Sequence, residues 1–577
     1  MFRHSIYSAI FLTPNLLVRS KITSTPLPYG PVGAAPDIAF VGPYPLNDHS
    51  KLSNLDAAGG HDAIYNRSFT SVNDMLSYAG VETGGRYSTG GTTWEYLGAS
   101  SGGLSDFKAL NAWHTSDFGV PYNNGEDVRA SLSAMASLIP DDGANIVFTS
   151  GLYTLDATGE SPTIQAPVRG MLLERDNVNI SAYGCDFRMI GIPKSYLISI
   201  DDFGSSGRDI FTFFTFLRNG NCSFFGGRFF GENEDNTPFR FQSPRAKGIG
   251  AIGVDSLKVR DSKFFSILGN GVNGTPSDGT IDGMYKPLHR LDVDGVESDN
   301  SWEGAVNFMG NTFKCSLVNS ELTNSTNGFE GASDGLVVSG NKMIGNRNGC
   351  SISGKNFSVT GNTIDNEEIS DSIGMILSSS ASALVQNGVI SGNQISNFAQ
   401  FGLTVFPTAS KILASGNFFE SEVQGGGTSI CINITGTPTN SIDDFDFAGN
   451  TVKTDANWGV SVSYNNSSNV SGNIVEGQVQ QSVIAQTGND GCRFVSNVCD
   501  NVIVVSGDTN YEQGNVTPNS GREFRQNISI GSVPTGQMWL VGDRIYNRIT
   551  FPGYDWAFVV RTAGPDGTAA FTSLGVV

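Results

Sequence analysis

One phrase recurs along the second half of the chain: LVVSGNKMIGN (336–346), FSVTGNTIDN (357–366), GVISGNQISN (388–397), ILASGNFFE (412–420), FDFAGNTVK (445–453) and NVSGNIVEG (469–477). In each copy apolar and polar residues alternate, a Gly-Asn pair follows, and the alternation resumes. Alternation with a period of two is typical of a strand whose side chains point to opposite faces, and Gly and Asn are turn residues. The phrase therefore predicts two short strands joined by a tight turn.

The copies are spaced like the coils of a solenoid. Asn341 aligns with positions 362, 393, 417, 450, 473 and 497, and weaker copies extend the series upstream to about residue 177. A repeat of about 20–35 residues made of short strands predicts stacked coils in which each strand pairs with its equivalent in the next coil. A sandwich or a propeller would instead show hairpin pairs with two-residue turns, or blades of about 40 residues, and neither pattern is found. We expect the aligned Asn residues to form structural ladders.

Composition excludes several classes of protein. The 577 residues include 71 Gly and 37 Phe, and the formal net charge is −20. Abundant Gly disfavours a helical bundle, ample aromatic residues disfavour disorder, and the acidic balance disfavours a nucleic-acid partner. The sequence contains no run of 18 apolar residues, so we expect no helix that spans a membrane. The seven cysteines are scattered and the acidic cluster 232–235 lacks the spacing of a calcium loop, so we expect no metal and no cofactor.

The segment upstream of the coils predicts a helix over residues 126–138, with Val128, Leu132, Met135 and Leu138 on one face. A helix at this place would cover the open strand edges at the end of the stack. We expect residues 61–110 to form a small β-rich connector domain, residues 111–510 to form the solenoid and residues 511–577 to form a C-terminal β domain.

Three segments resemble bacteriophage tailspikes, which are built on the right-handed parallel β-helix of pectate-lyase-like proteins. Two segments of this chain resemble the start of that β-helix. They are Ser116-Asp117-Phe118-Gly119-Val120 and, further along, Thr149-Ser150-Gly151-Leu152-Tyr153. Residues 68–96 resemble a small phage-tail segment, and residues 536–577 resemble the ending of many phage tail proteins. The resemblance covers about 510 of the 577 residues. It implies an all-β fold, a right-handed parallel β-helix with small N-terminal and C-terminal β domains, assembled as a homotrimer.

The resemblance also implies a function. Phage tailspikes bind a bacterial surface polysaccharide and often cleave it, by hydrolysis or by β-elimination. Such a protein is made in the host cytoplasm and acts from the virion tail at the bacterial surface. Residues 1–60 are expected to attach it to the phage tail, the baseplate or an adaptor protein. The alternatives to a hydrolase are a lyase on the same scaffold, an adhesin that only binds glycan, and a secreted bacterial enzyme.

Hydrolysis of a glycosidic bond needs two carboxylates. Aligning WEGAVNF (302–308) and TNGFEGAS (326–333) with later strands places Glu330 on the outer surface, at the position of Ser351 and Thr404. Glu303 lies one coil earlier. We expect Glu303 and Glu330 to be catalytic, and Asp334, four residues further on, is the alternative partner of Glu330.

The insertion 267–290 precedes these acids and is expected to be a loop, because it is rich in Gly, Pro and Asp. If this loop forms one wall of a groove, it would supply side chains that bind the substrate. Trp302, just before Glu303, is the candidate aromatic residue for stacking against a sugar ring. A lyase would use similar residue types, a base to remove a proton and a cation to neutralise a uronate. The candidate substrate-binding residues are Asp282, Tyr285, Lys286, His289, Arg290 and Trp302.

Overall fold

The computed structural model describes most of the chain downstream of residue 66. The described ranges are 67–81, 83–98, 101–160, 167–192, 211–232, 246–278, 284–301, 303–367, 369–378, 384–421, 430–477, 481–505, 509–515, 523–526, 544–547, 555–562 and 570–576. The predicted attachment segment 1–60 lies outside them, as do Asp282 and Trp302.

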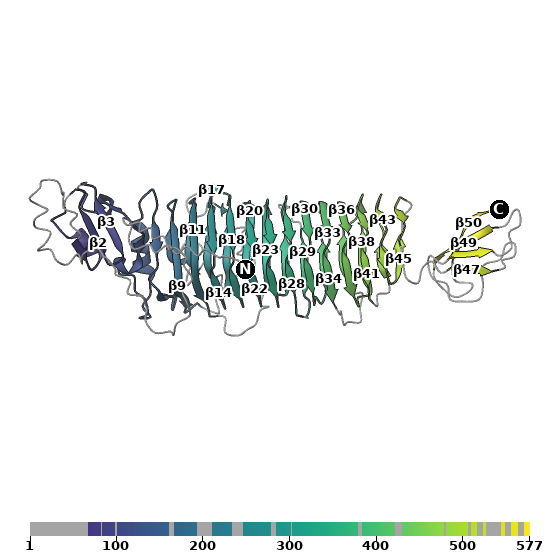
Figure 1. The fold of residues 1–577 in the computed structure, drawn as a ribbon, viewed down its shortest axis with the longest axis horizontal. Helices are drawn as coiled ribbons and strands as arrows, with labels where there is room; N and C mark the ends of the chain where they lie inside the picture. Colours follow the sequence, from purple (N-terminus) through teal and green to yellow (C-terminus); the bar gives the residue numbers. More distant parts are fainter. Residues whose placement is uncertain are drawn as a thin grey trace, which may run out of the picture. The chain divides into compact units, whose positions relative to one another are not determined.

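The strand register confirms the right-handed parallel β-helix (Figure 1). Each coil contributes one strand to each of three faces, and every strand pairs in parallel with its equivalent in the next coil. Two long strands, β9 (Asn179–Ile190) and β11 (Cys222–Phe230), run through the first two faces at the start of the stack.

The three faces follow one another around each coil. Face 1 consists of β13 (Leu257–Arg260), β18 (Leu291–Asp294), β21 (Ser316–Val318), β24 (Val337–Ser339), β27 (Ser358–Thr360), β30 (Gln386–Ser391), β33 (Ser410–Ser415), β36 (Ile442–Ala448), β40 (Asn469–Ser471), β43 (Arg493–Val495) and β46 (Tyr511–Gln513). Face 2 consists of β14 (Lys263–Phe265), β19 (Glu297–Asp299), β22 (Glu321–Thr323), β25 (Lys342–Ile344), β28 (Thr363–Asp365), β31 (Gln394–Ser396), β34 (Phe418–Ser421), β37 (Thr451–Thr454), β41 (Ile474–Glu476) and β44 (Val498–Cys499). Face 3 consists of β8 (Val168–Leu173), β10 (Phe211–Leu217), β12 (Ala246–Ile252), β15 (Gly269–Thr275), β20 (Gly304–Phe313), β23 (Asn327–Asp334), β26 (Asn348–Ile352), β29 (Ile373–Leu377), β32 (Phe401–Val405), β35 (Ile430–Thr435), β38 (Trp458–Ser463), β42 (Gln481–Ala485) and β45 (Val502–Val505).

The corners between the faces differ in length. From β13 to β44, two residues join each strand of face 1 to the next strand of face 2, as Gly340 and Asn341 do between β24 and β25. The corners on either side of face 3 vary, and the longest, residues 191–210, connects β9 to β10. Insertions therefore flank face 3 at both of its edges, whereas the corner between faces 1 and 2 is uniform.

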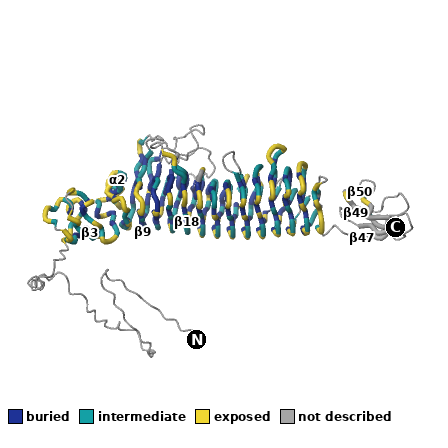
Figure 2. Tube along the Cα trace, turned by 90° about the horizontal axis from the view of Figure 1, so that it is seen from above, coloured by how far each residue is buried: buried dark blue, intermediate teal, exposed yellow. Residues whose placement is uncertain are grey.

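Aromatic side chains fill the interior of the first coils. Tyr153, Phe187, Phe229 and Phe264 occupy equivalent positions in consecutive coils and are fully buried. Their rings stack in sequence, with centroid separations of 5.5, 4.9 and 4.9 Å. Buried residues continue through every coil of the stack (Figure 2). The core is thus one continuous column, which no single coil could bury alone.

The predicted Asn ladder is confirmed. The side-chain amide of each ladder Asn donates to the Oδ1 of the next, at 2.9–3.1 Å. Each Oδ1 also accepts a backbone N–H, as Asn417 Oδ1 does from Asn393 N at 3.0 Å. The ladder runs through Asn341, Asn362, Asn393, Asn417, Asn450, Asn473, Asn497 and Asn515.

Replacing Asn417 with alanine is expected to lower the free energy of unfolding by about 3 kcal/mol, because it leaves the buried backbone N–H of Asn393 without an acceptor. Denaturant unfolding followed by circular dichroism measures the change. Gln394→Ala, at an exposed position of the neighbouring coil, is the control and should stay within about 0.5 kcal/mol of the wild type. Equal effects in both variants would contradict the ladder's role.

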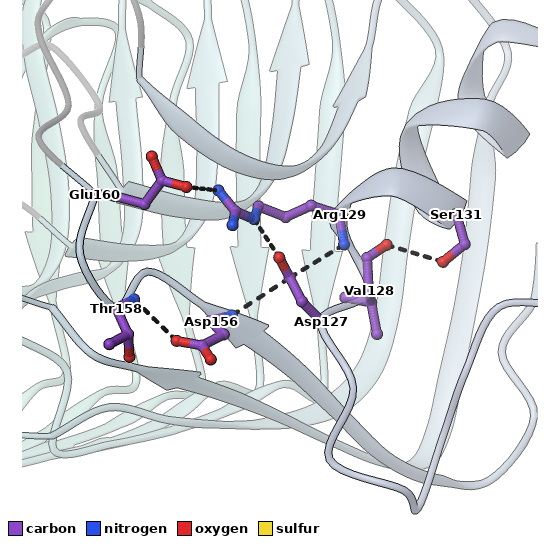
Figure 3. Close-up of polar contacts among 7 residues, drawn as sticks. All are labelled: Asp127, Val128, Arg129, Ser131, Asp156, Thr158 and Glu160. Atoms are coloured by element: carbon purple, nitrogen blue, oxygen red, sulfur yellow. Dashed lines mark hydrogen bonds and ion pairs between the residues drawn. The ribbon is translucent and has the colours of Figure 1, made fainter.

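A short helix packs against the first strand of face 3. Helix α2 (Arg129–Ser137) buries Leu132 and Met135 and contacts β8. Leu138, predicted on the same face, lies just beyond the helix and is exposed. It begins three residues later than predicted because Asp127 instead pairs with Thr154. The Arg129 guanidinium joins Asp127, at 2.6 Å, to Glu160, at 2.8 Å, and so ties the start of the helix to the first coil (Figure 3).

The small N-terminal sheet joins the stack through Asp117. The sheet contains β1 (Arg67–Phe69), β2 (Arg86–Thr89), β3 (Thr92–Tyr96) and β4 (Phe107–Ala109), with helix α1 (Val72–Leu76) beside it. The buried carboxylate of Asp117 accepts hydrogen bonds from Gly91 N, Thr92 N and the Thr89 hydroxyl. The Asp of the Ser-Asp-Phe-Gly-Val motif thereby fixes the hairpin that ends before the first coil.

The C-terminal region contains a separate four-stranded sheet of β47 (Glu523–Gln526), β48 (Arg544–Asn547), β49 (Asp555–Thr562) and β50 (Ala570–Val576). Strand β46 pairs with β43, so the coils extend three residues beyond the predicted boundary at 510. Among the described residues, no helix has the length and hydropathy needed to cross a membrane.

Candidate active site

The structure brings Glu303 and Glu330 together on the outer surface of face 3. Glu330 lies in β23, in register with Asn307 of β20 and Ser351 of β26. Glu303 directly precedes β20, and its carbonyl oxygen accepts a hydrogen bond from Asn327 N at 3.1 Å. The predicted outward position of Glu330, aligned with Ser351 and Thr404, is confirmed by the register.

The alternation of inward and outward side chains is interrupted in β23. As a result, two side chains that are three residues apart both face outward. Gly328 and Phe329 are both buried, so Asn327 and Glu330 share the outer surface. Gly328 is required because a Cβ there would lie 2.6 Å from the carbonyl oxygen of Gly349 in the next coil. Asn327 Nδ2 then donates to Glu330 Oε2 at 3.3 Å, and Asn348 Nδ2 donates to Asn327 Oδ1 at 2.8 Å.

The environment of Glu330 favours its protonated form. Burial and the charge of Glu303 raise the pKa of Glu330 to about 7, and the hydrogen bond from Asn327 opposes this rise. Burial disfavours an ionised carboxylate, and a second carboxylate nearby has the same effect. The pair therefore combines one carboxyl group that holds a proton near neutral pH with a neighbouring Glu303 carboxyl group.

Asp334 is not part of this pair. It lies four residues beyond Glu330 on the same strand, about 13 Å away at 3.3 Å per residue. Its carboxylate accepts a hydrogen bond from Asn356 Nδ2 at 2.6 Å. Glu330 instead bends towards Asn327, at the opposite end of the strand. The structure thus favours Glu303 over Asp334 as the partner of Glu330.

The insertion 267–290 differs from the predicted loop. Residues 269–275 form β15 of face 3, and β16 (Ser277–Asp278) pairs with β17 (Tyr285–Lys286) as a short antiparallel ribbon. Gly-rich sequence misled the prediction, because Gly269 and Gly271 lie where a Cβ would meet the backbone of a neighbouring coil. Tight packing of coils, and not a turn, accounts for these glycines.

The described candidates from the insertion lie at the corner between faces 3 and 1. Lys286 Nζ pairs with Asp255 at 2.8 Å, and Arg290 Nε pairs with Asp292 at 2.7 Å. The ring of His289 stacks on Phe313, whose register partner is Asp334. Tyr285 is exposed. These side chains gather at the end of the face 3 strands, away from the acid pair at their start.

Sequence reasoning missed Asn327 and Asn348, which orient the acid. Strict alternation would have placed Gly328, and not Asn327, on the same side as Glu330. The signal that could have found them is the shared phrase Asn-Gly-apolar-x in 327–330 and 348–351. In the described part of the chain, no cluster of three or more His, Cys, Asp or Glu side chains is placed to hold a metal ion.

Comparison with known proteins gives matches among solved structures. No protein-family model and no curated protein sequence matches the chain. A tailspike mutant of E. coli bacteriophage HK620 in complex with a pentasaccharide is 11% identical, with 80% of this chain and 92% of that chain covered and a TM-score of 0.46. The Dettilon tailspike protein is 13% identical, with 72% and 71% covered and a TM-score of 0.45. The A-module of a mannuronan C-5 epimerase from Azotobacter vinelandii is 13% identical, with 70% and 99% covered and a TM-score of 0.42. The tailspikes and the epimerase are parallel β-helix proteins, and the strand register described above places this chain in the same fold class.

Proposed function

We propose that this protein is a phage tailspike that binds a bacterial surface polysaccharide and cleaves it by hydrolysis of glycosidic bonds. The observation that carries the proposal is the pairing of Glu330, which retains its proton near neutral pH, with Glu303 on the outer surface of face 3. Glycosidic hydrolysis requires one carboxyl group that donates a proton and a second that acts as base or nucleophile.

In this mechanism Glu330 is the general acid. It donates its proton to the glycosidic oxygen as the bond from that oxygen to the anomeric carbon breaks. Glu303 acts as the base that activates water, or as the nucleophile that attacks the anomeric carbon. Asn327 and Asn348 hold the Glu330 carboxyl group in place.

The remainder of face 3 suits a glycan. Its outward row continues from Glu330 through Ser351, Ile376, Thr404, Asn433 and Ser461. Ser351 and Asn433 are partly exposed and offer a hydroxyl and an amide group, whereas Thr404 and Ser461 are buried. Trp458 lies on the neighbouring outward row and is partly exposed, so it can stack against a sugar ring. The insertions at both edges of the face would supply the walls of a groove.

Hydrolysis is favoured over β-elimination because Lys286 and Arg290, the cations a lyase would aim at a uronate, are paired with Asp255 and Asp292 away from the acids. The test is incubation with capsules and lipopolysaccharides from a panel of bacterial strains, followed by mass spectrometry. Products with new reducing ends and no new ultraviolet absorbance support hydrolysis. An unsaturated product would establish a lyase, and binding without a product would establish an adhesin.

The same proposal places the protein on the virion tail, after synthesis in the host cytoplasm. Residues 1–60 attach it to the phage tail, baseplate or an adaptor protein, and the chain assembles as a homotrimer. Removal of residues 1–60 should therefore abolish incorporation into virions while leaving cleavage of the isolated polysaccharide intact.

Asn327→Ala is expected to raise the pKa of Glu330 further, because the hydrogen bond from Asn327 stabilises the ionised carboxylate. The alkaline limb of the pH–rate profile for cleavage should move to higher pH. Asn356→Ala removes a comparable amide from Asp334 and serves as the control, with an unchanged profile. A profile that shifts equally in both variants would argue against Glu330 as the titrating acid.

A further inference from the structure

A row of apolar side chains lies on the outer surface of face 3, downstream of the acid pair. It continues the strand position of Asn327 and Asn348, which are register partners, through the next four coils. All four side chains are partly exposed. The members of this apolar row are Ile373, Phe401, Ile430 and Trp458. Single exposed apolar residues are common, but a contiguous run of them marks a binding surface.

Buried glycines hold the apolar row on the outside of the stack. Gly374, Gly402 and Gly459 follow three of its members and point inward. A Cβ on Gly374 would lie 2.7 Å from the carbonyl oxygen of Gly402, and a Cβ on Gly459 would lie 2.6 Å from that of Ser482. These contacts with the next coil reserve the inward position for glycine. The large apolar residue before each glycine therefore faces outward, in the same arrangement as at the start of β23.

The apolar row is continuous with the acid pair. Asn348 precedes the row in the register and donates to Asn327, which in turn donates to Glu330. At about 4.8 Å per coil, Phe401 lies about 14 Å and Trp458 about 24 Å along the stack from the coil of Glu330. A polysaccharide that runs along the stack and is cleaved at Glu330 would therefore lay several consecutive sugar rings on the row.

The surface beside the row combines apolar side chains with a few polar groups. Ile376 and Ile484, on the outward row of Glu330, are partly exposed. Ser351 and Asn433, on that same row, offer one hydroxyl and one amide group. A surface that is mainly apolar and aromatic, with few polar groups, is typical of ligand sites.

The coils that carry the apolar row are acidic, and the strands of face 3 from β29 to β42 contain no Lys or Arg. Between residues 361 and 492 the sequence contains twelve Asp and Glu residues, two Lys and no Arg. Lys411 lies in β33 of face 1, and Lys453 lies in β37 of face 2. A carboxylate or phosphate group on a sugar would thus meet repulsion here and no ion-pairing partner.

We propose that the apolar row selects an uncharged polysaccharide whose repeating unit carries methyl groups, either as 6-deoxy sugars or as acetyl groups. This selectivity rests on the proposed function, because the row is the continuation of the proposed cleavage site. Phe401 and Trp458 stack against the apolar faces of sugar rings. Ile373 and Ile430 contact the methyl groups and remove them from water.

Equilibrium binding to a panel of purified polysaccharides of known repeating unit tests the chemistry of the ligand. Glu330→Gln is used so that cleavage does not consume the probe. Every polysaccharide that binds should be uncharged and carry 6-deoxy or acetyl groups. Its affinity should change less than about twofold between about 0.05 and 0.5 M salt, because screening acts on charges. Tight binding of a polysaccharide with a uronate or phosphate in each repeat, or binding of none, would overturn the proposal.

Treatment of the bound polysaccharide with mild alkali separates the two sources of methyl groups. Loss of binding after removal of the acetyl groups would assign recognition to acetyl. Unchanged binding of a polysaccharide with 6-deoxy sugars would assign it to the deoxy methyl groups. Unchanged binding of one that has no 6-deoxy sugar would overturn the proposal.

Phe401→Ala and Trp458→Ala should each weaken that binding about tenfold or more, because truncation of a buried aromatic anchor is costly for binding. Phe418→Ala is the matched control, since Phe418 is a partly exposed phenyl ring on face 2, and it should keep the affinity. Unchanged affinity in both row variants would overturn the proposal. A lower molecular mass of these variants by light scattering would do so too, because it would assign the row to contacts between copies.

The outcome for hydrolysis is separate from the outcome for selectivity. Binding that follows the proposed pattern without any product would support the selectivity and contradict hydrolysis. Cleavage of a polysaccharide with a uronate in each repeat would support a cleavage site and contradict the selectivity.

Discussion

Glu330→Gln is expected to lower the turnover number for polysaccharide cleavage roughly a thousandfold, because a positioned general acid contributes about 10²–10⁴-fold. Glutamine keeps the shape of the side chain but cannot donate the proton. Glycan binding and assembly should remain, since the surrounding strands are unchanged. Reducing-end release and equilibrium binding to the uncleaved polysaccharide measure the two properties separately.

Glu321→Gln is the matched control, because Glu321 lies on face 2 of the same coil and pairs with Lys342 at 2.8 Å. It should retain wild-type turnover. The pH dependence gives an independent check: the wild-type rate should fall as pH rises through about 7, where Glu330 loses its proton. Wild-type turnover in Glu330→Gln would remove this residue from the chemistry.

The raised pKa of Glu330 also makes the free energy of unfolding depend on pH. The pKa of Glu330 is raised in the folded state above its ordinary value of 4.5, so the folded state binds the proton more tightly than the unfolded state does. The stabilisation is present at low pH and is lost as pH rises to about 7. Above pH 7, Glu330→Gln should therefore be at least as stable as the wild type.

Phe187→Ala is expected to lower the free energy of unfolding by about 3–5 kcal/mol, the usual cost of removing a buried phenyl ring. Phe187 stacks on Tyr153 and Phe229 and meets Phe214 edge-to-face at 5.1 Å. The cavity would lie between the first coils, where the stack begins. Denaturant unfolding followed by circular dichroism measures the loss.

Phe406→Ala removes the same ring from a position that is 47% exposed, and it should change the free energy of unfolding by less than about 1 kcal/mol. A similar loss in both variants would mean that the aromatic column is not what stabilises the first coils.

The repeat predicted most of the fold because its two physical signals are local. Alternation specifies which side chains enter the core, and Gly-Asn specifies the corner, so the outward position of Glu330 followed from alignment with Ser351 and Thr404. The prediction did not anticipate that Gly328 and Phe329 both turn inward. That reversal depends on contact with Gly349 in the next coil, which is not visible in one strand's sequence.

The insertion shows the same limit. Gly269 and Gly271 suggested a loop, yet they pack against neighbouring coils within face 3. Lys286 and Arg290 were expected beside the acids and instead form ion pairs at a corner. The stacking of the coils in three dimensions determines which surface charges form ion pairs. The burial of an apolar residue, in contrast, follows from the hydrophobicity of its own side chain.

The unequal corners imply how such a protein can change its target without losing its fold. Segments of different length enter at both borders of face 3, while the paired strands and the Asn ladder continue past them undisturbed. Under the proposed function, exchange of these segments would change which polysaccharide is recognised while the column beneath stays intact. The constant corner has no such freedom, because a single inserted residue there would disturb the ladder in that coil and in both neighbours.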